Sequence, residues 1–189
     1  MRQRSTSPRA GAWLLALGLG LAGGGSAGTS AAPGEPAGWT TYRNEHYGFA
    51  FAYPASVFAP VPPRAGDGLS DRASERSGQA FASRDGSAFI TAAAAPNATG
   101  DGPRAYRARA IANSYAKARI TFERMESDGF VVSGFKGRDI FYERVVFSCG
   151  GRVVNAWVAT YPAAQRARYD PIVEALAGNF RPGARGGCR

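Results

Sequence analysis

The sequence predicts an α+β fold, in which one antiparallel sheet is covered by helices on both faces as an α/β/α sandwich. Four short segments after Ile120 alternate apolar and polar residues and are separated by glycine-containing pairs, a pattern typical of an antiparallel meander. Two of these segments are apolar on both faces, so both faces must be covered. Two segments with helical spacing, near residues 103–118 and 169–180, can supply that cover.

The first 31 residues have the features of a cleavable export signal. Three arginines precede an apolar run, Ala12–Ala22, which is too short to span a membrane, and small residues follow it. Cleavage after Ala27 or Ala31 satisfies the preference for small residues before the cut, whereas an uncleaved anchor helix would need a longer apolar run. Because no cysteine stands at either cut, we expect a mature protein without a lipid anchor and without a transmembrane segment.

The remainder, about 155 residues, is enough for one domain with a substantial core. We expect a linker at residues 32–38, the domain at 39–182 and a tail at 183–189. The net charge of +9 falls to about +6 when the three signal arginines are removed. The other arginines are dispersed and are not interleaved with aromatic residues, a pattern that predicts solvated charge and no nucleic-acid partner. The alternative, an anion-binding stripe, would need clustered arginines.

The first half of the domain predicts short strands separated by turns. Aromatic residues alternate with glycine and alanine over residues 48–53, as expected for a strand. Pro60–Gly78 is polar and rich in proline and glycine, which indicates a loop. Asp85 and Gly86 can adopt a positive φ, so they predict a hairpin turn between strands around Phe81 and Phe89.

Proline and apolar spacing predict two helices. Pro103 suits the first turn of a helix that continues to about Ala118. Its spacing assigns Ala108, Ile111 and Tyr115 to the core and Arg109, Asn113 and Lys117 to solvent. The last helix is expected to begin with Asp170 as its cap and Pro171 as its first residue.

The predicted meander occupies residues 120–161, with junctions at Asp128-Gly129, Lys136-Gly137 and Gly150-Gly151. Its two long strands and the last helix define the predicted core. The core residues are Phe141, Val145, Phe147, Val153, Trp157, Ile172, Leu176 and Phe180.

Three stretches resemble the Mog/PsbP-like superfamily. They are the pattern Y-x-N-x-x-Y-G-F-x-F-x-Y-P at Tyr42–Pro54, the D-G-S-A hairpin at Asp85–Ala88, and the closing Y-P…Y-D-P-I-V at Tyr161–Val173. The resemblance spans Trp39 to Pro182, nearly the whole mature chain. It implies an α/β/α sandwich on an antiparallel sheet.

The resemblance implies a binding or assembly module, because members of the superfamily share no active site. They include an extrinsic subunit of photosystem II, a Ran-GTPase-binding import factor and exported bacterial proteins. No functional motif of any member is matched here, so no metal, chloride or partner residue carries over. The missing lipid-attachment cysteine departs from the lipid-anchored bacterial members.

The candidate catalytic residues are a histidine and two acids. His46, the one histidine of the chain, lies in the turn before the first core strand, and a serine triad would have to bring Ser87 or Ser133 to it. Glu123 and Glu143 lie on predicted meander strands and could form a carboxylate pair. We expect His46 to be an ordinary loop residue and each acid to be neutralised by an arginine from an adjacent strand or a helix.

Cys149 and Cys188 are the only cysteines of the chain, and we expect them to form a structural disulfide. An even count in an exported protein favours pairing. The tail after Phe180 can reach roughly 20 Å back toward a strand end. The alternatives are a buried free Cys149 with an intermolecular bond through Cys188, or a metal site with two thiolate ligands.

Taken together, the sequence predicts an exported, monomeric and non-enzymatic binding or assembly module of the bacterial cell envelope. We expect no cofactor, and the partner is an envelope protein or a small ligand, contacted through one face of the sandwich or through Pro60–Gly78. The alternative is a periplasmic hydrolase built on the carboxylates or on His46.

Overall fold

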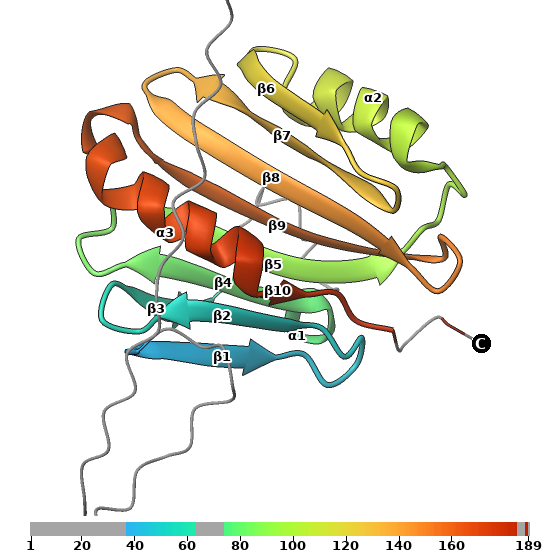
Figure 1. Ribbon diagram of the computed structural model, residues 1–189, viewed down its shortest axis with the longest axis horizontal. Helices are drawn as coiled ribbons and strands as arrows, with labels where there is room; N and C mark the ends of the chain where they lie inside the picture. Colours follow the sequence, from blue (N-terminus) through green and yellow to red (C-terminus); the bar gives the residue numbers. More distant parts are fainter. Residues whose placement is uncertain (1–36, 63–73, 185–187, 189) are drawn as a thin grey trace, which may run out of the picture. The chain divides into compact units, whose positions relative to one another are not determined.

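The computed structural model describes residues 37–62, 74–184 and 188, which all belong to one compact unit (Figure 1). The predicted signal peptide, most of the linker and most of the Pro60–Gly78 loop lie outside the described residues. The strands are β1 (Trp39–Arg43), β2 (Ala50–Pro54), β3 (Phe58–Val61), β4 (Gly78–Ser83), β5 (Phe89–Pro96), β6 (Arg119–Met125), β7 (Gly129–Lys136), β8 (Asp139–Ser148), β9 (Val153–Pro162) and β10 (Phe180–Arg181). The helices are α1 (Ser74–Ser77), α2 (Pro103–Ser114), the 3-10 helix η1 (Ala163–Gln165) and α3 (Arg166–Asn179).

The larger sheet has seven strands in the order β3-β4-β5-β9-β8-β7-β6, and all its neighbours are antiparallel. Strands β6 to β9 form the predicted meander, and β4 and β5 form the predicted hairpin, with Gly86 at φ 69° in its turn. Strand β5 pairs with β9, which joins the hairpin to the meander.

One face of the larger sheet is covered by a second sheet together with α3. The second sheet has three strands in the order β1-β2-β10, so the residues directly after α3 return to pair with β2 (Figure 1). Every residue of β2 is buried. The Phe51 ring lies 6.0 Å from that of Trp157 on β9 and 6.3 Å from that of Phe180 on β10, which places aromatic side chains of both sheets in one core.

The opposite face carries a smaller apolar cluster beneath α2. Tyr115 stacks on Phe141 with ring centroids 4.1 Å apart, and Tyr106 packs edge-on against Phe147 at 5.5 Å. The cluster consists of Tyr115, Phe130, Val132, Phe141, Val145, Phe147 and Val154. No residue within α2 itself is fully buried. The buried Tyr115 lies directly after the last residue of the helix.

The predicted α/β/α sandwich is wrong. Nearly half of the described residues lie in strands, as ten strands in two sheets, and only two described helices exceed one turn. The sequence predicts one sheet that includes the strand at residues 48–53. That strand is β2 (Ala50–Pro54) and belongs to the second, three-stranded sheet, and its alternation of aromatic and small residues allows both of its faces to be buried.

Seven of the eight predicted core residues are buried, including Trp157 and Leu176 at 0% exposure, whereas Ile172 is only partly buried. The helix predictions need correction. Ala108 is exposed, and the α2 residues that pack against the sheet are Tyr106, Ala110 and Ile111. Helix α3 begins at Arg166, more than one turn before the predicted cap Asp170, which instead accepts hydrogen bonds from Tyr161 and Arg166.

Candidate functional site

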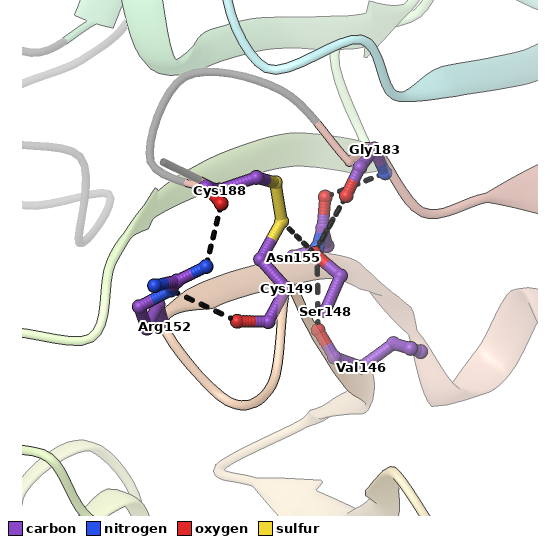
Figure 2. Close-up of a disulfide and its surroundings, with 7 residues drawn as sticks. All are labelled: Val146, Ser148, Cys149, Arg152, Asn155, Gly183 and Cys188. Atoms are coloured by element: carbon purple, nitrogen blue, oxygen red, sulfur yellow. Dashed lines mark hydrogen bonds between the residues drawn. A yellow bond between two sulfur atoms is a disulfide. The ribbon is translucent and has the colours of Figure 1, made fainter.

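Cys149 and Cys188 form a disulfide in the structure, as the sequence predicts (Figure 2). Cys149 begins the turn between β8 and β9 and has a φ of 56°. Arg152, from the same turn, donates hydrogen bonds to the carbonyl oxygen of Cys188 at 2.5 Å and to that of Cys149 at 3.1 Å. The described end of the chain is therefore held at this turn by a covalent bond and by Arg152.

A buried asparagine holds the chain just before the disulfide. Asn155 is fully buried, and its Oδ1 accepts a hydrogen bond from the backbone N–H of Gly183 at 2.9 Å. The Ser148 hydroxyl donates to the Gly183 carbonyl at 2.6 Å (Figure 2). A side chain at Gly183 would overlap the backbone carbonyl of Tyr47, so this position requires glycine. These contacts indicate a structural role for this end of the chain.

The candidate binding site is a groove between α2 and the larger sheet, with a volume of about 310 Å³. Its floor is made of small and β-branched residues from β5 and β9, among them Thr91, Ala93, Ala156 and Val158. Helix α2 forms the wall with Tyr106, Arg109, Ala110, Asn113 and Ser114. We call this the α2 groove. Because the floor side chains are small, they leave a space next to α2. Leucine or phenylalanine at the same floor positions would fill that space.

Glu143 lies at the floor of the α2 groove. Burial raises the pKa of its carboxyl group from 4.5 to about 7, and a hydrogen bond from Tyr115 opposes that shift. Its Oε2 atom is buried and has no hydrogen-bond partner among the described residues. The residues directly opposite Glu143 on the neighbouring strands are Val132 and Val158, which cannot satisfy a carboxylate.

The expected arginine partner exists for Glu123 but not for Glu143. Arg107, from α2, forms an ion pair with Glu123 on β6. The register aligns Glu123 with Val132, and Val132 with Glu143, so strand β7 lies between the two acids. Two strand spacings separate their backbones by roughly 10 Å. Arg107 neutralises one of the acids, so they do not form the pair of interacting carboxylates that the sequence left open.

The remaining candidate residues are not brought together. His46 is exposed in the turn between β1 and β2, where its ring packs against that of Tyr47 at 4.6 Å. Ser87 donates to Asp85 in the β4–β5 turn, and the Ser133 hydroxyl donates to the carbonyl of Phe141. Within the described residues no hydrogen bond links His46 to either serine. The His46 triad therefore has no geometric support.

Arg109 and Asn113 were assigned to solvent by their helical spacing, yet both line the α2 groove. Arg109 pairs with Asp101, donates to Thr99 at 2.9 Å and lies over the Tyr106 ring at 5.0 Å, so its charge is engaged at the β5 to α2 connection. The sequence held one usable signal for the groove, the run of four alanines at 92–95 in β5, where large side chains would be expected in a closed core.

A second depression lies on the α3 side of the larger sheet, with a volume of about 540 Å³. Its lining includes Phe122 on the edge strand β6, which is 47% exposed, together with Tyr142 and Tyr161. Two acids line this depression: Asp170 is paired with Arg166, and Glu174 is exposed. Unlike the α2 groove, this depression is lined by no buried carboxylate that lacks a hydrogen-bond partner in the described part of the chain.

Two further features concern metals and membranes. Within residues 37–62, 74–184 and 188, no three histidine, cysteine, aspartate or glutamate side chains gather closely enough to hold a metal ion. No helix in the described part of the chain combines the length and apolarity needed to cross a bilayer.

Comparison with known proteins identifies the fold. No family model matches the chain, and no curated protein sequence matches it. The solution structure of cyanobacterial PsbP (CyanoP) from Synechocystis sp. PCC 6803 is similar, with a TM-score of 0.55 and 11% identity over 81% of this chain and 97% of that one. A crystal structure from Bacteroides thetaiotaomicron VPI-5482 has a TM-score of 0.44 and 13% identity over 73% of this chain and 46% of that one. The first match supports a PsbP-like fold.

Proposed function

We propose that the protein is a non-enzymatic binding or assembly module of the bacterial cell envelope. In this proposal residues 1–31 are a cleaved export signal, 32–38 a linker, 39–182 the domain and 183–189 a tail held by the Cys149–Cys188 disulfide. The mature protein is periplasmic or secreted and acts as a monomer, without a cofactor and without binding nucleic acid. The basic, apolar N-terminal sequence and the disulfide support export.

The observation that carries the proposal is the α2 groove, an open concave surface whose one acid, the partly buried Glu143, has no catalytic neighbour in the described part of the chain. Ligand sites are commonly concave, mostly apolar and provided with a few placed polar groups. The α2 groove has this composition, with alanine and valine on its floor and Glu143, Asn113 and Ser114 as polar groups. The PsbP-like fold agrees with a binding role.

The hydrolase alternative rests on the same acid. A carboxyl group whose pKa is raised to about 7 is suited to general acid–base catalysis. Such catalysis also needs a second group, and Glu123 is occupied by Arg107 on the far side of β7. The other titratable residues that line the groove are Tyr106 and Arg109, and the positive charge of Arg109 is paired with Asp101. Binding therefore has better support than hydrolysis.

Photo-crosslinking in the exporting bacterium tests the binding function. A photoreactive phenylalanine analogue is placed at Ala93 in the α2 groove or at Ser56, an exposed turn residue outside it. After irradiation, the purified protein is analysed by intact mass and gel electrophoresis. We expect a discrete adduct from Ala93 and none from Ser56. Absence of any adduct at Ala93 would contradict the proposal, as would equal labelling at the two positions.

A further inference from the structure

Glu143 has an unusual environment for a structural acid. Its hydrogen bond comes from a neutral hydroxyl, that of Tyr115, and its Oε2 has no partner among the described residues. The side chain as a whole is only partly buried, but Oε2 is fully buried, and a buried carboxylate oxygen without a partner costs more free energy than an ordinary missing hydrogen bond. A leucine or glutamine would close this region of the sheet at lower cost. The carboxylate therefore suggests a group that arrives from outside.

The surroundings of Glu143 define what that group must be. Within the described residues the Glu143 Oε2 atom accepts no hydrogen bond, so the group that meets it must donate one. In the described part of the chain no cation compensates the carboxylate, because the positive charges of Arg109 and Arg107 are each paired with another acid. The floor beside Glu143 is formed by Ala156 and Val158, which suit an apolar body. An anionic ligand would be repelled by the Glu143 carboxylate. A neutral apolar ligand would leave Oε2 without a hydrogen-bond donor.

We infer that the α2 groove binds a small organic amine, with its ammonium group on the Glu143 carboxylate and its apolar part on the alanines of β5 and β9. This inference rests on the proposed binding function and names the ligand class. The Asn113 and Ser114 side chains, on the wall of the groove, can contact polar substituents of the ligand. Binding satisfies the unpaired oxygen and replaces the missing positive charge.

The pH dependence of binding follows from the same geometry. The titratable and charged groups around Glu143 are Tyr106 and Arg109 from α2, Tyr115 directly after α2, and the Arg107–Glu123 pair. The neighbouring strands β7 and β9 face Glu143 with valines. Burial raises the pKa values of both tyrosines above their usual range, so they stay neutral at physiological pH. Glu143 is protonated below its pKa of about 7 and cannot then form an ion pair. Amine affinity should therefore rise between pH 6 and pH 8.

Nuclear magnetic resonance titration of the mature protein tests the inference with three probes of one shape: benzylamine, benzyl alcohol and benzoate. We expect benzylamine to cause saturable amide shifts at Thr91, Ala93 and Ser114, with an affinity that rises at least threefold from pH 6 to pH 8. Glu143→Gln should weaken benzylamine binding at least tenfold. Glu174→Gln, a matched change on the exposed side of α3, should leave it within twofold of wild type.

The outcomes separate this inference from the broader function. Stronger binding of benzyl alcohol or benzoate at the same amides would overturn the amine assignment while leaving a binding groove in place. Saturable benzylamine shifts confined to residues outside the groove, unchanged affinity in Glu143→Gln, or no saturable shift with benzylamine would also overturn it. If Glu143→Gln does not fold, the pH dependence of the wild-type affinity decides the question, and a flat profile overturns the inference.

Discussion

Replacing Glu143 with glutamine should remove a pH-dependent loss of stability. In the folded protein this carboxyl group keeps its proton up to a pH of about 7, whereas in the unfolded chain it releases the proton near its ordinary pKa of 4.5. Between these values the folded state binds more protons, so raising the pH favours the unfolded state. The stabilising contribution of the protonated group is complete below pH 4.5 and is lost as the pH rises to 7.

The size of this effect follows from the two pKa values. A pKa rise from 4.5 to about 7 corresponds, at about 1.4 kcal/mol per pH unit, to roughly 3 kcal/mol of stability. For a domain of this length, about 3 kcal/mol shifts the melting temperature by roughly 6–12 °C. Glutamine has nearly the same shape and no proton to release, so the variant should lack this loss.

The assay is urea denaturation of wild type and Glu143→Gln between pH 4.5 and pH 8, with the disulfide intact. The difference between their free energies of unfolding should change by roughly 3 kcal/mol across this range, in favour of the variant at high pH. Comparing the two proteins cancels the contributions of groups that titrate in both. Parallel pH profiles, with a difference that changes by less than about 1 kcal/mol, would show that Glu143 is solvated or paired in the folded protein.

Other predictions concern the core, the disulfide and the histidine. Trp157→Ala removes a fully buried ring and should lower the free energy of unfolding by roughly 3–5 kcal/mol, and a melting temperature within error of wild type would contradict its central position. Cys188→Ser opens a loop with a sequence separation of 39 residues and should cost up to about 4 kcal/mol. Intact mass before and after reduction checks the bond, and two alkylated thiols in the unreduced protein would exclude it. His46→Ala should keep ligand or partner binding within about threefold of wild type, since this exposed side chain packs, among the described residues, against the ring of its neighbour Tyr47. A hundredfold loss with an intact fold would restore a role for His46.

The meander could be predicted because its information is local. Alternating apolar residues specify strands β6 to β9, and glycine-containing pairs mark the turns between them. The second sheet could not be predicted in this way. Strand β10 has two residues and pairs with β2, which is near the other end of the domain. Such a short strand has no periodicity of its own, and its partner depends on where α3 ends.

The candidate site was only partly predictable for a related reason. Alternation placed Glu143 on a strand of the meander, but its partner depends on the position of α2. Arg107 of that helix forms an ion pair with Glu123, and Tyr115, just past the end of the helix, donates a hydrogen bond to Glu143. Helical spacing predicts Arg109 in solvent, because it describes the two faces of a helix and not where the helix lies on the sheet. Among the described residues no element covers the sheet beside α2, and the expected polar face of α2 becomes one wall of the groove.

The most direct test of the account is the titration of Glu143 itself. The carbon-13 shift of its side-chain carboxyl group can be followed from pH 4 to pH 9, with Glu143→Gln assigning the signal. The account predicts a midpoint near pH 7 in the free protein, because the group is buried without a charged partner. It also predicts that saturating benzylamine lowers this midpoint. A midpoint close to the ordinary value of 4.5 would contradict both the environment described for Glu143 and the amine site built on it.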